Sequence, residues 1–288
     1  MRSVTAETIT EAFLGYFGDE VNPRTHQLME RLAHHVHEFA KEVELTHDEW
    51  RACIEFLTEV GNITTAERNE FVLLSDVLGL SSLVDMIHSD PHGTSSSVLG
   101  PFHISNPPRL PYGGDLKRDN DGELVLVQGR VVGPAGEPIS GAELDIWQTA
   151  TNGMYSSQDD AQDTFNFHGL MTTDESGRYA FTTVKPVPYT VPTDGPVGRI
   201  LDATGRHPWR PSHLHVIARA QGFRTLVTEI FPDDDPYLDQ DTVFGVRSDL
   251  VMRYQARAAA EFPDGMVLSG QVETAFEQVD FDLRLVAD

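Results

Sequence analysis

The chain has 288 residues, 40% of them hydrophobic, and a formal net charge of −24. This length allows one large domain or one domain with a helical addition, and the negative charge disfavours nucleic acid and anionic lipid as partners. No run of 18 apolar residues predicts a membrane span, and the single cysteine, Cys53, excludes an intrachain disulfide. Because the first residues lack the apolar core of a signal peptide, we expect a cytoplasmic protein.

The first hundred residues have the apolar spacing of amphipathic helices. Residues 24–43 place apolar side chains at steps of three and four along one stripe. Thr46 followed by Glu49 has the pattern of a capping box, and Thr64 followed by Glu67 repeats it. We therefore expect helices to begin at both threonines.

After residue 90 the pattern changes to connectors rich in glycine, proline and serine, followed by short runs typical of strands. Strands are expected at residues 123–132, 142–148, 178–184, 213–220, 225–231, 266–274 and 279–286. Several short strands at this spacing favour an antiparallel sandwich or barrel. The predicted fold class is α+β, with a helical N-terminal domain over residues 1–105 and an antiparallel β-sandwich over residues 106–288.

The stretch RPSHLHVIA, residues 210–218, places His213 and His215 on one face of a predicted strand. Such a pair is either two histidines bonded to backbone in a half-buried sheet or half of a metal site. Nine of the other histidines are expected to be structural or solvated: His26, His34, His35, His37, His88, His92, His103, His168 and His207. Two acidic runs, at residues 158–163 and 232–241, do not match the calcium-binding EF-hand loop and are expected to be solvated loops.

Two tyrosines stand in unusual surroundings. Tyr155 follows Gly153 shortly after the predicted strand AELDIWQ, and Tyr189 lies between Pro188 and Pro192. The prolines restrict the backbone on both sides, which limits the directions in which the Tyr189 ring can point. Ordinary packing is the alternative role for either tyrosine.

Three stretches in order, LDIWQTATNGMYSSQ, TDESGRYAFTTVKPVPYTVPTDGPVG and GRHPWRPSHLH, closely resemble the intradiol ring-cleavage dioxygenases, the catechol 1,2-dioxygenase family. The resemblance extends from about residue 10 to the C-terminus. It implies one non-haem Fe(III) per subunit, held by Tyr155, Tyr189, His213 and His215. It also implies that the helical domain serves dimerisation and that the β-sandwich is catalytic.

The chemistry of these side chains agrees with that ion. Fe(III) is a hard cation and phenolate is a hard anionic oxygen donor, and a bound trivalent ion would lower the pKa of tyrosine enough to ionise it at neutral pH. A ferrous oxygenase more often uses two histidines and one carboxylate, and zinc more often binds histidine, cysteine or carboxylate. Two phenolates with two imidazoles therefore favour the ferric ion.

The resemblance implies that a ring with two adjacent hydroxyls chelates the iron, reacts with O2 and opens between the hydroxyl-bearing carbons. In this family the tyrosine matching Tyr189 leaves the iron and accepts a proton, and the arginine matching Arg210 stabilises negative charge. Counted without gaps from His215, Glu229 stands where relatives commonly carry a neutral amide. A carboxylate there would pair with Arg210 or have a raised pKa.

Within the family, FVLLSDVLGLSSLVD at residues 71–85 and SSVLGPFH at residues 96–103 are most similar to the hydroxyquinol 1,2-dioxygenase branch. This branch converts benzene-1,2,4-triol to 3-hydroxy-cis,cis-muconate or its tautomer maleylacetate. Asp76 is expected to accept a hydrogen bond from the third hydroxyl. The substrate-binding positions implied are Leu73, Asp76, Val98, Leu99, Gly100, Pro101, Phe102, Val191, Pro192 and Glu229. Catechol and chlorocatechol stay open as alternative substrates.

The resemblance also implies a homodimer formed through the helices, with a phospholipid bound at the interface. Two interpretations of other classes stay open. One is a non-enzymatic β-sandwich that binds a small aromatic ligand, with the tyrosines as packing. The other is a zinc hydrolase that uses His213, His215 and a carboxylate such as Glu229.

Overall fold

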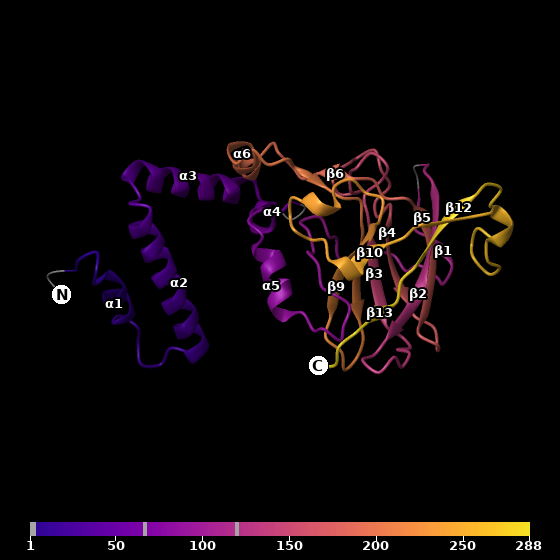
Figure 1. The fold of residues 1–288 in the computed structure, drawn as a ribbon, viewed down its shortest axis with the longest axis horizontal. Helices are drawn as coiled ribbons and strands as arrows, with labels where there is room; N and C mark the ends of the chain where they lie inside the picture. The colour runs from indigo at the N-terminus through magenta and orange to yellow at the C-terminus, as the bar shows by residue number, and fades with distance from the viewer. Residues whose placement is uncertain (1–3, 66–67, 119–120) are drawn as a thin grey trace. The chain divides into compact units, whose positions relative to one another are not determined.

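The computed structural model describes residues 4–65, 68–118 and 121–288. The chain divides into two compact units, residues 1–59 and residues 60–288. The first unit contains α1 (Ile9–Leu14), α2 (Pro23–Glu42) and most of α3 (His47–Ile63), drawn in indigo to purple in Figure 1.

The predicted capping box at Thr46 is confirmed. The Thr46 N–H donates to Glu49 Oε2 at 2.9 Å, and the Glu49 N–H donates to Thr46 Oγ1 at 3.3 Å. These two bonds satisfy backbone donors that the first turn of α3 leaves without helical partners.

The apolar stripe of α2 exists as expected. Its members are between 48 and 56% exposed, although they form one face of an amphipathic helix: Leu28, Leu32, Val36, Phe39 and Val43. Large apolar side chains repeated along one exposed helix face are typical of a surface that packs against another chain.

In the second unit, one helix begins at a different residue from the one that the sequence predicts. Thr64 does not begin a helix; its hydroxyl donates back to the Val60 carbonyl at the end of α3. The next helix, α4 (Glu70–Val77), begins after Asn69, whose side chain accepts from the Val72 N–H. The other half of the predicted box, Glu67, lies outside the described residues. The Thr64 hydroxyl also accepts from the Glu70 N–H at 3.2 Å, so it links the end of α3 to the first residue of α4. The fifth helix, α5 (Leu80–His88), follows directly.

Two β-sheets pack face to face in this unit. The strands are β1 (Gly114–Asp115), β2 (Leu124–Val132), β3 (Glu143–Trp147), β4 (His168–Thr172), β5 (Arg178–Val184), β6 (Tyr189–Thr190), β7 (Trp209–Arg210), β8 (Leu214–Arg219), β9 (Leu226–Pro232), β10 (Val251–Met252), β11 (Gln255–Arg257), β12 (Phe276–Asp280) and β13 (Leu283–Arg284). Among the described residues, one sheet has the order β1-β5-β2-β12-β11, with β13 also paired to β2, and the other has the order β10-β9-β8-β3-β4. The short strands β6 and β7 pair with each other, and α6 (Pro196–Ala203) lies between them in sequence.

The sequence predicts a purely antiparallel sandwich, but the observed sandwich is mixed. The central ladders β2–β5, β3–β8 and β8–β9 are antiparallel, whereas β12 and β13 both run parallel to β2. The strand expected at residues 266–274 is wrong. Gly265 and Gly270 both have positive φ there, at 82° and 75°, so the chain turns and extends only from Phe276.

The core lies between the two sheets and fixes which side chains face the other way. Leu144 and Ile146 of β3 are fully buried in it, together with Val216 of β8 and Phe181 of β5. Because side chains alternate along a strand, Asp145 and Trp147 of β3 project from the face opposite to Leu144 and Ile146. That outer face carries the candidate site.

Among the described residues, no single helix is long and apolar enough to cross a membrane. The bent pair α4 and α5, with a 71° angle at the break, meets the length and composition criteria only jointly.

Candidate metal centre

Two short stretches of strand and one loop position four donor side chains. His215 lies within β8 and His213 directly before it, so both rings project from one face of the sheet, as the H-x-H spacing predicts. Tyr189 begins β6, where it pairs with Arg210 of β7. Tyr155 lies in the loop that follows β3.

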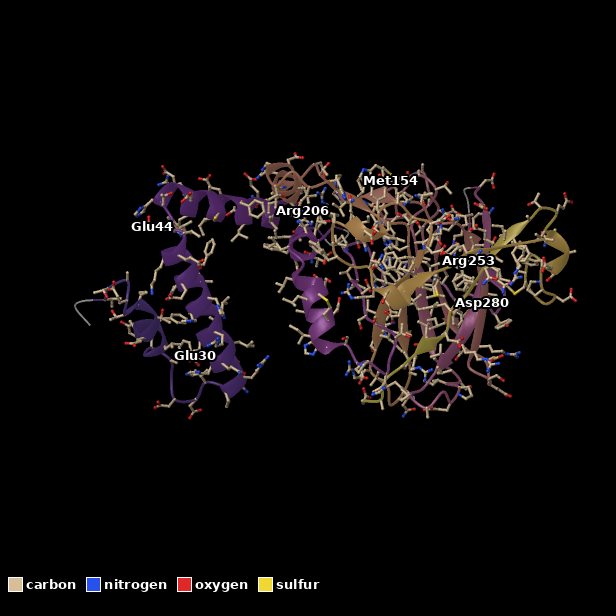
Figure 2. The ribbon with its side chains drawn as sticks, viewed as in Figure 1. Glu30, Glu44, Met154, Arg206, Arg253 and Asp280 are labelled. Carbon is tan, nitrogen blue, oxygen red and sulfur yellow. The ribbon has the colours of Figure 1, made fainter. Side chains whose placement is uncertain are left out.

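The loop that carries Tyr155 passes close to Tyr189. Gly153 has a positive φ of 78°, and a Cβ at this position would lie 3.2 Å from the Tyr189 Cβ. Glycine therefore allows both the turn and the close approach. Met154, which is labelled in Figure 2, is exposed, and the next side chain, Tyr155, points inward and is 4% exposed.

The four donor atoms converge. The Tyr155 Oη lies 3.1 Å from the Tyr189 Oη, 3.3 Å from the His213 Nε2 and 3.0 Å from the His215 Nε2. The His213 Nε2 lies 3.5 Å from the Tyr189 Oη and 3.2 Å from the His215 Nε2. Four buried N and O atoms at these separations surround one point, as the ligands of a metal ion do.

The protonation of the histidines suits metal binding. The His213 Nδ1 lies 2.7 Å from the Pro211 carbonyl, which can only accept, so Nδ1 carries the proton and Nε2 presents its lone pair. Burial lowers the pKa of both His213 and His215 well below the usual value, so both rings are neutral. Burial also raises the pKa of Tyr155, and the neighbouring Tyr189 raises it further. Without a cation the phenols keep their protons; a metal ion would reverse this. The residues fit such an ion.

Arg210 lies beside this group and carries its charge into a buried network. Its guanidinium donates to Asp241 from Nε at 3.1 Å, and its Nη1 lies 2.9 Å from the Glu229 Oε1. Burial lowers the pKa of Arg210, but Asp241 and Glu229 outweigh burial and raise it well above its usual value. A Cβ on Gly245 would lie 2.7 Å from Glu229 and 2.8 Å from Arg210, so this cluster needs glycine there.

Glu229 pairs with Arg210 rather than taking up a proton. Burial raises its pKa, but the Arg210 charge, His215 and the hydrogen bonds from Arg210 and Ser97 together outweigh burial, and the pKa of Glu229 is lowered overall. Ser97 and Arg210 both donate to its Oε2. The other oxygen, Oε1, lies 3.4 Å from the His213 Nε2 and 3.5 Å from the His215 Nδ1. His215 therefore presents Nε2 to the tyrosines and Nδ1 to Glu229.

A small pocket adjoins the donors. Its lining is Leu73, Asp76, Gly100, Pro101, Phe102, Tyr189, Val191, Pro192, Arg210 and Val243. Seven of the ten substrate positions expected from the sequence are thus brought together at one place. Of the other three, Val98 is buried outside this lining, Leu99 is 43% exposed, and Glu229 lies behind Arg210.

Asp76 is held in this pocket by the packing of α4. Arg206, labelled in Figure 2, donates to the carbonyls of Val77 at 2.7 Å and Thr242 at 2.6 Å. This clamp ties the end of α4 to the segment that carries Asp241. Burial raises the pKa of Asp76 to about 6, against the opposing influence of Ser81 and Arg210.

Sequence reasoning did not single out Asp241 and Val243. Asp241 belongs to an acidic run that was expected to be a solvated loop, yet it is 6% exposed and paired to Arg210. Its distance of 31 residues from Arg210 leaves no local pattern that would have found it.

Comparison with known proteins agrees with this geometry. The family model described as catechol dioxygenase N terminus matches residues 22–94, and the model described as dioxygenase matches residues 109–287. The chain belongs to the intradiol ring-cleavage dioxygenases. Members of this family use non-haem iron.

Several relatives of this intradiol dioxygenase are similar over most of their length. A hydroxyquinol 1,2-dioxygenase of Rhizobium sp. is 46% identical over 252 residues, covering 86% of this chain and 85% of the relative. A 6-chlorohydroxyquinol 1,2-dioxygenase of Cupriavidus pinatubonensis is 44% identical over 253 residues, covering 87% and 92%. The crystal structure of hydroxyquinol 1,2-dioxygenase from Pseudomonas putida DLL-E4 superposes with a TM-score of 0.87 at 43% identity, covering 98% of this chain and 99% of that one. Membership of this enzyme family disfavours the non-enzymatic binder and the zinc hydrolase.

Proposed function

We propose that this intradiol dioxygenase cleaves hydroxyquinol with O2 between its two adjacent hydroxyl-bearing carbons, giving 3-hydroxy-cis,cis-muconate or maleylacetate. The observation that carries the proposal is the convergence of two buried phenols and two neutral imidazoles beside a small pocket. The relatives named above act on hydroxyquinol or its 6-chloro derivative, which supports the substrate. Catechol or chlorocatechol is the alternative.

Tyr155, Tyr189, His213 and His215 are the proposed ligands of the iron, held as Fe(III). Bound by these residues, a ferric ion would supply Lewis acidity toward the diol oxygens and would accept electron density from the ring. The protein contributes two ionised phenols, which match the hard trivalent charge, and two neutral nitrogen donors. This donor set supports the ferric over the ferrous state.

Two residues are the proposed catalytic groups around the substrate. Tyr189 lines the pocket, and its phenol is proposed to accept a proton from a substrate hydroxyl. Arg210 lines the same pocket and carries a fixed positive charge, held in place by Asp241 and Glu229. A preoriented cation stabilises negative charge as it develops on the ring oxygens.

Asp76 is proposed to accept a hydrogen bond from the third hydroxyl of the substrate. It lies in the pocket lining, is 2% exposed, and belongs to a rigid helix. An ionised carboxylate accepts a hydrogen bond from the 4-hydroxyl of hydroxyquinol and has no partner when catechol binds. Leu73, Phe102, Val191 and Pro192 supply the apolar walls that hold the ring.

The helical segments support a homodimer, because apolar side chains stand exposed along α2 and along α3, including Trp50, Ile54 and Leu57. A phospholipid at that interface is the finer form of this proposal. The division into a helical dimerisation domain over residues 1–105 and a catalytic domain over residues 106–288 stays a prediction, as does the cytoplasmic location.

Oxygen uptake by the iron-loaded enzyme tests the proposed reaction. Hydroxyquinol, catechol and 4-chlorocatechol are compared side by side at equal concentrations, with product identified by mass. We expect kcat/KM to be highest for hydroxyquinol. A higher kcat/KM for catechol or 4-chlorocatechol would make that compound the assigned substrate. The absence of oxygen uptake with all three would overturn the proposed function.

A further inference from the structure

A row of side chains crosses four neighbouring strands on the outer face of the β10-β9-β8-β3-β4 sheet. In register, Glu229 of β9 lies opposite His215 of β8, His215 opposite Trp147 of β3, and Trp147 opposite His168 of β4. The Trp147 ring stacks on the His215 ring, with centroids 4.5 Å apart and planes 6° apart. The Trp147 indole therefore lies between the proposed iron ligand His215 and the side chains around His168.

Beyond the indole lies a second group of metal-binding side chain types. The His103 Nε2 lies 3.0 Å from the Asp145 Oδ2, and the His168 Nε2 lies 2.8 Å from the Asp145 Oδ1. The three ligand atoms are all within 4.8 Å of one another. Their side chains are only 16, 6 and 4% exposed for His103, Asp145 and His168.

We propose that His103, Asp145 and His168 form a second metal site, distinct from the iron site, that binds a divalent transition ion of the zinc class. Two imidazole nitrogens and one carboxylate are the donors that Zn²⁺, Co²⁺ and Cu²⁺ take in proteins, whereas Ca²⁺ and Mg²⁺ take oxygen donors. Three protein ligands leave a further coordination position for water, and the partial exposure of His103 gives access from solvent.

The geometry of the cluster suits this ion. Each oxygen of Asp145 lies within hydrogen-bond distance of one imidazole Nε2, so the carboxylate already stands between the two rings. A neutral imidazole needs only to move its proton from Nε2 to Nδ1 in order to present a lone pair.

Two neighbours bear on the affinity. Arg219 Nη1 lies 4.0 Å from the Asp145 Oδ2, but its side chain is 45% exposed and can turn into solvent. Trp147 closes the other side, with its ring centroid 4.7 Å from the His103 ring. Asp145 is hydrogen-bonded to both imidazoles, and an ion bound by the three side chains would replace these two hydrogen bonds by three coordinate bonds.

The site would link three segments that are far apart in the sequence. His103 precedes β1, Asp145 lies in the middle of β3, and His168 begins β4. An ion held by all three stabilises the folded state only, so the melting temperature should rise with its concentration. Because Trp147 stacks on His215, the ion also fixes the ring that supports one iron ligand.

Metal counting on the iron-loaded protein tests the proposal. The protein is dialysed against Zn²⁺ at a concentration fixed by a chelator, and iron and zinc per chain are measured by elemental analysis. We expect one zinc in addition to the iron in the wild type, and its loss in His168→Asn and in His103→Asn. The matched control His92→Asn, at an exposed loop position, should keep the zinc.

Two further measurements keep the test decisive if a variant folds poorly. Zinc-edge X-ray absorption of the wild type should show imidazole scattering from two histidines, and zinc should raise the melting temperature of the wild type but not of His103→Asn. An iron-loaded wild type that binds no zinc, or zinc without imidazole ligands, would overturn the proposal. His213→Ala separates the two sites: zinc retained there without iron leaves the second site standing even if the iron assignment fails.

Discussion

The Glu229 carboxylate and the His215 imidazole face each other inside the protein, with Oε1 and Nδ1 3.5 Å apart. Both atoms are buried; the Glu229 Oε1 is also paired with the Arg210 Nη1 at 2.9 Å, whereas the His215 Nδ1 makes no hydrogen bond to any described residue. If the His215 Nε2 binds iron, its Nδ1 must carry the proton and points at Glu229. A carboxylate behind a metal-bound histidine orients the ring and strengthens it as a ligand.

Replacing Glu229 by leucine should weaken iron binding by roughly 10–100-fold, because the Nδ1 proton then has no acceptor. Glu229→Gln should weaken it less, since an amide oxygen still accepts. Competition with a ferric chelator measures both affinities, with Glu143→Gln on β3 as the matched control. An unchanged affinity in Glu229→Leu would remove Glu229 from the support of the site.

Arg210→Ala should keep the bound iron and the visible absorption expected of tyrosinate bound to Fe(III). Its kcat should fall roughly 10²–10³-fold, because the guanidinium charge acts on the substrate. The change also leaves Glu229 and Asp241 as buried, unpaired carboxylates, which lowers stability. Arg210→Lys keeps a charge there and should recover part of both losses. Steady-state oxygen uptake, corrected for folded protein, measures kcat; full activity in Arg210→Ala contradicts the assignment.

The parts of the fold that follow from local pattern could be predicted from the sequence. The Thr46 capping box formed because both of its bonds span only three residues, and β2, β3, β5, β8 and β9 lie where apolar runs predict strands. The H-x-H pair shares a face because strand alternation fixes it. Its tyrosine partners were placed by family resemblance, since Tyr155 lies 58 residues and Tyr189 lies 24 residues from His213, and such separations give no local signal.

Features decided by tertiary contact could not be predicted. Strands β6 and β7 have two residues each, too short for any period. The parallel pairing of β12 with β2 depends on how the C-terminal segment crosses the sheet. The sequence gives no sign that His168 begins a strand; its pairing with Trp147 makes it the first residue of β4.

Replacing Asp76 by alanine should lower kcat/KM for hydroxyquinol much more than for catechol, because only the triol offers a third hydroxyl. A site built for a hydroxyl loses the hydrogen bond, worth about 1–3 kcal/mol, which corresponds to a drop of about 5–150-fold in the ratio of the two kcat/KM values. Oxygen uptake with both substrates gives this ratio. An unchanged ratio would mean that Asp76 does not read the third hydroxyl.

Asp76 should also make stability depend on pH. Its folded pKa of about 6 lies above the unfolded value near 4, so the native state binds this proton more tightly. The stability it contributes is complete below about pH 4 and is lost as pH rises through about 6, by about 2–3 kcal/mol. In urea unfolding, the free energy of unfolding of Asp76→Asn should therefore rise relative to that of the wild type between pH 4 and 7. The exposed Asp160→Asn serves as control, and a constant difference for Asp76→Asn would contradict the raised pKa.

The direct measurement of the central claim is the visible and resonance Raman spectrum of the iron-loaded protein. Tyrosinate bound to Fe(III) absorbs visible light and should give a red protein with phenolate vibrations enhanced in the Raman spectrum. Tyr155→Phe should lose iron or bleach this band, and His213→Ala should do the same. A colourless wild type with iron bound, or a Tyr155→Phe variant with unchanged colour and turnover, would contradict the four-ligand ferric site.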